Sequence, residues 1–138
     1  MTTTPARTKI SRPAAPADLN ATFKSLRGLL RAYRPPLVAK VDGPRRYELW
    51  STKDVEIAGR KRSEVFFAAV IIQKSYVGFY LMPVYAAPEM KRVFAPELLG
   101  LLKGKSCFHI KSLDAHLMAR IKSALAKGFR LYKKNGWV

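Results

Sequence analysis

The sequence predicts an α+β domain in which an antiparallel sheet of about five strands is covered on one face by an N-terminal and a C-terminal helix. An amphipathic helical pattern begins the folded part, several short β segments follow, and a longer helical pattern ends the chain. With 138 residues, of which 49% are hydrophobic, the chain is long enough for one domain with its own core. We therefore assign residues 18–138 to a single domain. Residues 1–17 are rich in Thr, Pro and Ala and are predicted to form a disordered basic tail.

Apolar side chains at steps of three and four predict a first helix from about Leu19 to Tyr33. Asp18 is placed to cap its N-terminus, and the Pro35-Pro36 pair ends it. Four cations at the same spacing form a second, basic stripe along this helix. They are Lys24, Arg27, Arg31 and Arg34.

Short β segments dominate the middle of the chain, and one more precedes the last helix. They are residues 37–41, 46–51, 55–58, 65–72, 76–81 and 107–110. The segment Val65–Ile72 is apolar on both faces, so we expect a central strand that is covered on both sides or paired with a partner, which permits a homodimer. Pro83 ends the strand before it, and residues 86–102 are expected to form short helical turns around Pro88 and Pro96.

The final helix is predicted to begin at Asp114 or Ser112 and to continue to about Tyr132. Its apolar face repeats with helical periodicity. That face consists of Leu117, Ile121, Ala124, Leu125, Phe129 and Tyr132. Arg120, Lys127 and Lys134, spaced by seven, follow a solvent-facing line of the same helix.

The chain is strongly basic, with 26 Lys and Arg against nine Asp and Glu and a net charge of +17. Such a field favours polyanions, so we expect a nucleic acid or an acidic protein as partner. The predicted contacts are the basic residues of the two helices. Their two basic lines would form one surface if the helices lie side by side. Lys103 and Lys105 are also predicted contacts, because the glycine-containing loop that carries them can bind a phosphate. A helix C-cap at Gly104 is the alternative explanation of that loop.

The longest unbroken apolar run is Val65–Ile72, whereas a membrane-spanning helix needs about 20 residues, so no membrane span is predicted. Residues 1–16 lack the apolar region of a secretory signal. A single cysteine, Cys107, excludes an intramolecular disulfide and fits a reducing compartment. These observations together predict a cytoplasmic protein.

Cys107 and His109 alternate along a predicted strand and therefore share a face. With His116 they form a candidate zinc or iron site, although the alternative is a half-buried Cys and His beside a solvated His116. Activation of the Cys107 thiol by His109 would instead give a nucleophile. The sequence contains no hydrolase, metalloprotease, P-loop or dinucleotide-binding motif. We therefore predict no catalytic residues, no cofactor and a binding or scaffolding role.

Three aromatic side chains, Trp50, Tyr76 and Tyr80, can share one face of the sheet. Aromatics interleaved with cations can stack nucleic-acid bases, although such a face more often belongs to a core. A further alternative is a small-molecule pocket, an apolar cleft between sheet and helices lined by Trp50, Tyr80 and Met82.

Three segments of the chain resemble, in the same order, the YdhG-like domains of bacteria. They are YVGFYLMPVY at residues 76–85, LKGKSCFHIK at 102–111 and KGFRLYKK at 127–134, within a similarity that covers about residues 36–138. The resemblance implies a frataxin-like fold with two helices on one antiparallel sheet. For one group of members it also implies an iron chaperone.

Iron binding of the frataxin type uses an acidic ridge on the first helix, and hard iron prefers carboxylate oxygens. The first helix of this chain carries the four cations of its basic stripe and no carboxylate beyond Asp18. A metal chaperone built on this chain would therefore rely on Cys107, His109 and His116 in place of acids. We take this role as the alternative to polyanion binding.

Overall fold

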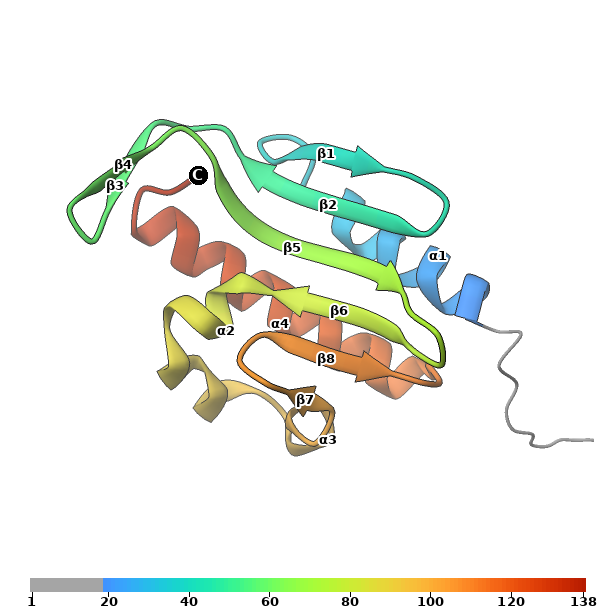
Figure 1. Ribbon diagram of the computed structural model, residues 1–138. Coiled ribbons are helices and arrows are strands. Elements are labelled where there is room, and N and C mark those ends of the chain that lie inside the picture. Colours follow the sequence, from blue (N-terminus) through green and yellow to red (C-terminus); the bar gives the residue numbers. More distant parts are fainter. Residues whose placement is uncertain (1–18) are drawn as a thin grey trace, which may run out of the picture.

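The computed structural model describes residues 19–138 and confirms the predicted α+β class (Figure 1). Six antiparallel strands form one sheet in the order β1-β2-β5-β6-β8-β7, and β3 and β4 form a separate two-stranded ribbon. The N-terminal helix α1 and the C-terminal helix α4 lie on the same face of the six-stranded sheet (Figure 1). The predicted tail and the Asp18 cap lie outside the described residues.

The helices and strands follow the predicted order, with additions in the second half of the chain. The helices are α1 (Leu19–Arg31), α2 (Met82–Ala86), the 3-10 helix η2 (Pro88–Val93), α3 (Pro96–Leu99) and α4 (Ala115–Lys134). The strands are β1 (Val38–Asp42), β2 (Arg46–Ser51), β3 (Val55–Ile57), β4 (Arg60–Arg62), β5 (Val65–Ile72), β6 (Val77–Leu81), β7 (Leu102–Lys103) and β8 (Cys107–Ile110). Within the described residues, no helix combines the length and apolar character needed to cross a membrane.

The core lies between the sheet and the two long helices. One inward-facing row of paired residues runs Tyr47–Val70–Phe79–Phe108 across four strands, and all four are buried. At the centre of the layer, the fully buried ring of Phe67 packs against the rings of α4 and of the turn after α1. Its centroid lies 5.1 Å from Tyr132, 6.1 Å from Phe129 and 6.0 Å from Tyr33.

Several local predictions differ from the structure. Pro83 stands in the first turn of α2, where the missing proline N–H costs no hydrogen bond, so it begins a helix as well as ending a strand. Gly104 has a φ of +76° and lies in the turn between β7 and β8. Because a strand and not a helix precedes it, it is not a helix C-cap. Arg60–Arg62, which lies outside the predicted β segments, pairs with β3 as β4. Of the two predicted starts of the last helix, Asp114 is the cap, because its Oδ1 accepts from the Leu117 N–H at 2.7 Å.

β5 is a central strand between β2 and β6, as its apolar sequence predicts, but helices cover only one of its faces. The opposite face of the sheet, which points toward the viewer in Figure 1, carries no helix formed by residues 19–138. The outward-facing Phe66 and Ile71 are only half-buried there. We call this side of the sheet the uncovered face, and pairing of this face with a partner stays a prediction.

Candidate nucleic-acid interface

The four predicted cations of the first helix lie on α1 and the turn that follows it, and we call them the α1 stripe. Lys24 and Arg34 are exposed. The guanidinium carbon of Arg27 lies 5.3 Å from the ring centroid of Phe23, and that of Arg31 lies 5.7 Å from the centroid of Tyr47. Arg31 also approaches the Asp42 carboxylate at 3.7 Å. Aromatic rings therefore hold two of the four side chains in place without neutralising them.

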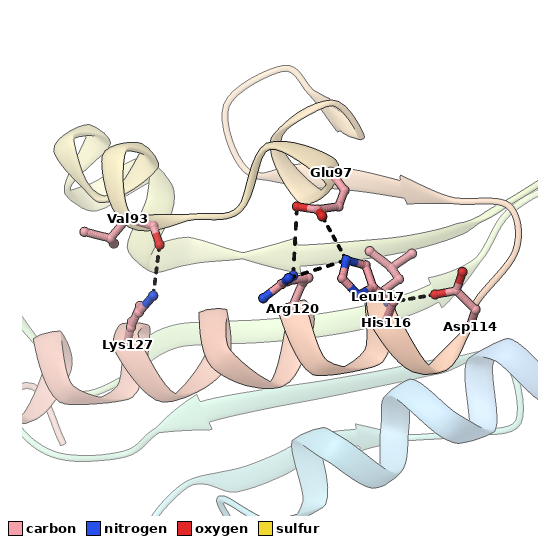
Figure 2. A network of polar contacts seen from close by, with 7 residues as sticks. All are labelled: Val93, Glu97, Asp114, His116, Leu117, Arg120 and Lys127. Carbon is pink, nitrogen blue, oxygen red and sulfur yellow. Dashed lines mark hydrogen bonds and ion pairs between the residues drawn. The ribbon is translucent and has the colours of Figure 1, made fainter.

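The predicted cations of α4 face a different direction. Lys127 Nζ donates to the Val93 carbonyl at 2.9 Å, and Arg120 lies 3.9 Å from Glu97, so both point toward η2 and α3 (Figure 2). In the same view α1 lies on the other side of α4. The two basic lines do not merge, because Arg120 and Lys127 lie on the flank of α4 that contacts η2 and α3, away from α1. Lys134 is exposed in the last turn of α4.

The two lysines of the predicted phosphate loop are separated by the β7–β8 turn. Lys103 is exposed on β7 and pairs with Cys107 across the sheet. Lys105 lies in the turn, with Nζ 5.6 Å from the ring centroid of Tyr85 on α2. The predicted polyanion contacts therefore fall into separate regions, and four of the nine belong to the α1 stripe.

The positive charge of the described part of the chain is largely uncompensated. Residues 19–138 contain 23 lysines and arginines but eight aspartates and glutamates. Only four of those 23 cations form ion pairs with carboxylates within the described residues. They are Arg31, Lys40, Arg46 and Arg120. Surface cations without acidic neighbours are free to neutralise an external polyanion.

The predicted metal ligands are not brought together. Cys107 and His109 share the uncovered face of β8, where the His109 ring stacks on Tyr76 with centroids 3.8 Å apart. His116 lies on α4, with Nε2 2.8 Å from Glu97 Oε2 (Figure 2). This contact is the main reason that the pKa of the Glu97 carboxyl lies below its usual value. Among residues 19–138, no three His, Cys, Asp or Glu side chains are grouped as a metal ion would require.

Cys107 lies in an environment that disfavours its thiolate. Burial raises the pKa of the Cys107 thiol, and a hydrogen bond with Tyr80 offsets this only in part. A nucleophilic cysteine needs the opposite shift, because the thiolate is the reactive form. The direction of this pKa shift therefore disfavours the predicted activation by His109.

We expect iodoacetamide to alkylate Cys107 in the folded protein more slowly than a free cysteine peptide at the same pH near 8. Intact-mass spectrometry over time gives the rate. Urea-unfolded protein serves as the control, and its rate should rise to that of the peptide, because unfolding removes the burial. Alkylation of the folded protein faster than the peptide would contradict this expectation and support an activated thiol.

Aromatic side chains gather on the uncovered face. Trp50 and Phe66 pair between β2 and β5 with ring centroids 5.2 Å apart. Tyr80 extends over its neighbour Gly78, because a Cβ built on Gly78 would lie 2.8 Å from Tyr80 Cε1. Tyr76 stacks on His109 beside them, and all five aromatic side chains are half-buried. Trp50, Tyr76 and Tyr80 thus share a face, as predicted, but it is not the face that forms the core.

This placement is incompatible with the predicted cleft between the sheet and the helices. Trp50 and Tyr80 lie on the uncovered face, opposite α1 and α4, and Met82 is the first residue of α2. Side chains such as Phe67 and Phe79, both fully buried, occupy the space between the layers.

Charged groups accompany the aromatics of the uncovered face. Glu48 accepts from Trp50 Nε1 at 2.9 Å and from Arg46 Nε. Burial raises the pKa of Glu48, but these hydrogen bonds and the charge of Arg46 outweigh it, so the net pKa lies below its usual value. Lys40 contacts Glu64, and its Nζ lies 4.9 Å from the ring centroid of Trp50. Phe66, Arg46 and Lys40 are not among the residues predicted for this face, although the alternation of Arg46, Glu48 and Trp50 along β2 indicates that these three share it.

Comparisons of the chain with models of known protein families, with curated proteins and with solved structures found no significant match. Membership of the YdhG-like family and the iron chaperone that it implies therefore stay predictions.

Proposed function

We propose that this protein is a binding domain for nucleic acid and that the α1 stripe is its main contact with the phosphate backbone. The observation that best supports this proposal is the excess of positive charge: only four of the 23 lysines and arginines of residues 19–138 are paired with carboxylates. Nucleic acid is the polyanion that suits such a surface, because each phosphate that a cation neutralises releases condensed counterions, and this release favours binding.

The α1 stripe suits phosphate better than the other basic regions do. Its three arginines offer planar guanidinium groups, which match phosphate oxygens in a two-point geometry. Phe23 and Tyr47 already restrain Arg27 and Arg31, so less side-chain freedom is lost on binding. Within residues 19–138 the only ion pair of the stripe joins Arg31 to Asp42 at 3.7 Å, so the other three cations are uncompensated there.

The test is the affinity for fluorescent single-stranded and duplex oligonucleotides, measured by anisotropy across a salt series with nuclease-treated protein. We expect the logarithm of affinity to fall linearly with the logarithm of salt concentration. Replacing Lys24, Arg31 and Arg34 together with glutamine should lower the magnitude of the slope by about 2 for single strands, since each lost phosphate contact accounts for about 0.7.

The matched control replaces the three exposed cations of β4, Arg60, Lys61 and Arg62, with glutamine. This variant loses the same charge from the β3–β4 ribbon, and its slope should stay close to that of the unmodified protein. Equal losses in both variants would mean that binding follows net charge and has no site on α1. Absence of binding at about 50 mM salt would contradict the proposal and favour an acidic protein as the polyanion.

A further inference from the structure

We propose that the uncovered face of the sheet is a stacking surface for the bases of single-stranded nucleic acid. This inference rests on the proposed function and adds the class of ligand and a second contact region. The α1 stripe would neutralise phosphates, whereas the uncovered face would receive unpaired bases. Aromatic side chains with exposed ring faces bind bases irrespective of sequence, because every base has a π-face.

The aromatic side chains form two groups on this face. Trp50 and Phe66 make one group, and Tyr80 with the Tyr76–His109 stack makes the other. In the row that runs Glu48–Ala69–Tyr80, the central residue is the small Ala69 on β5, and larger side chains stand on β2 and β6 on either side of it. Because neighbouring strands lie about 4.8 Å apart, β2 and β6 are separated by about 10 Å across β5. Successive bases of a flexible strand can therefore occupy the two groups separately.

The charge of the chain favours a polyanionic occupant of this face over a second copy of the chain. Lys40 lies against Trp50 and pairs with Glu64, and Arg46 on β2 pairs with Glu48. Lys103, at the other edge on β7, forms no ion pair within residues 19–138. Arg46 neutralises Glu48, the carboxylate in the middle of the face. A second copy would bring another net charge of +17 to the same surface, whereas a nucleic acid brings compensating phosphates. A duplex keeps its bases stacked internally, so only a single strand can offer them to these rings.

The two tryptophans of the chain provide a direct readout. Trp50 lies on the uncovered face, whereas Trp137 packs on Tyr132 at the C-terminus with centroids 5.1 Å apart. In a Trp137→Phe variant, Trp50 is the only tryptophan, and saturating oligo-dT should quench its fluorescence by stacking. In the reciprocal Trp50→Phe variant, fluorescence of Trp137 should change little. Inorganic polyphosphate, which has charge but no bases, should bind the Trp137→Phe protein without quenching Trp50.

Affinity measurements extend the test to Tyr80. Trp50→Leu and Tyr80→Leu should each weaken binding of oligo-dT by roughly 5- to 100-fold. Both variants should keep their affinity for polyphosphate and for duplex DNA, which also shows that they remain folded. Tyr85→Leu is the matched control, because Tyr85 is 51% exposed on α2 and lies outside the uncovered face. It should bind oligo-dT like the unmodified protein.

The outcomes separate this inference from the proposed function. Salt-dependent binding of oligo-dT that neither quenches Trp50 nor weakens in Trp50→Leu would overturn the stacking surface and leave the phosphate contact standing. If the unmodified protein bound no oligonucleotide at all, both the stacking surface and the proposed nucleic-acid binding would be overturned. Shielding of Trp50 that depends on protein concentration without nucleic acid would overturn the inference in favour of a second copy as the occupant.

Discussion

Replacing Phe67 with alanine is expected to lower the free energy of unfolding by about 3–5 kcal/mol. The Phe67 ring is fully buried and contacts rings from α4 and from the turn after α1, so truncation leaves a cavity where three elements meet. Domains of this size have a total stability of only about 5–15 kcal/mol, so a large part would be lost. Urea unfolding followed by circular dichroism measures the change.

The adjacent residue on the same strand is the matched control. Phe66 has the same side chain but lies half-buried on the uncovered face, and water can fill the space that its ring leaves. The backbone carbonyl of residue 66 accepts a hydrogen bond from the Tyr132 hydroxyl, and this bond is retained in Phe66→Ala. We expect this variant to lose about 1 kcal/mol. Equal losses for the two variants would contradict the assignment of the helix-covered and uncovered faces.

Gly128→Val is expected to destabilise the protein by about 1–3 kcal/mol through overpacking. Gly128 is buried in α4, and a Cβ at this position would lie 2.8 Å from Cγ and 3.1 Å from Cβ of Pro83. The pyrrolidine ring is rigid and stands in the first turn of α2, so the clash cannot be relieved by a rotamer change. Either α2 or α4 must shift, and thermal unfolding would report the lowered stability.

The same substitution at Gly28 controls for the intrinsic helix preference of valine. Gly28 is also inside a helix, but nothing lies within 4 Å of a Cβ built there. Because valine is a slightly better helix former than glycine, Gly28→Val should change the stability by no more than about 0.5 kcal/mol. A similar loss at both positions would show that the close approach of α4 to Pro83 is unimportant.

The sequence predicted those elements whose side-chain period is clear. The bounds of Arg46–Ser51, Val65–Ile72 and Cys107–Ile110 agree with β2, β5 and β8. The sequence did not predict β7, because two residues are too few for a pattern. It also missed α2, because a proline that ends a strand can equally occupy the first turn of a helix.

The arrangement of the candidate site was harder to predict than the elements. Alternation along a strand separates two faces, but it does not say which of them the helices cover, and β5 is apolar on both. Of the two interpretations of the aromatic face, base stacking or core, the favoured core position is therefore wrong, because Trp50 and Tyr80 are half-buried on the opposite side. Likewise, the spacing of Arg120 and Lys127 fixes a line along α4 but not the rotation of the helix about its axis.

The two borders of the six-stranded sheet restrict how another molecule can approach it. At one border, the pairing of β1 shifts register between Ala39 and Val41, with Lys40 at the irregularity. At the other, β7 offers only two residues, one of which is Lys103. Bulges, lysines and very short strands are the devices by which proteins block strand addition and edge-to-edge aggregation. A ligand of the sheet is therefore directed to its broad surface, where side chains rather than backbone amides make the contacts.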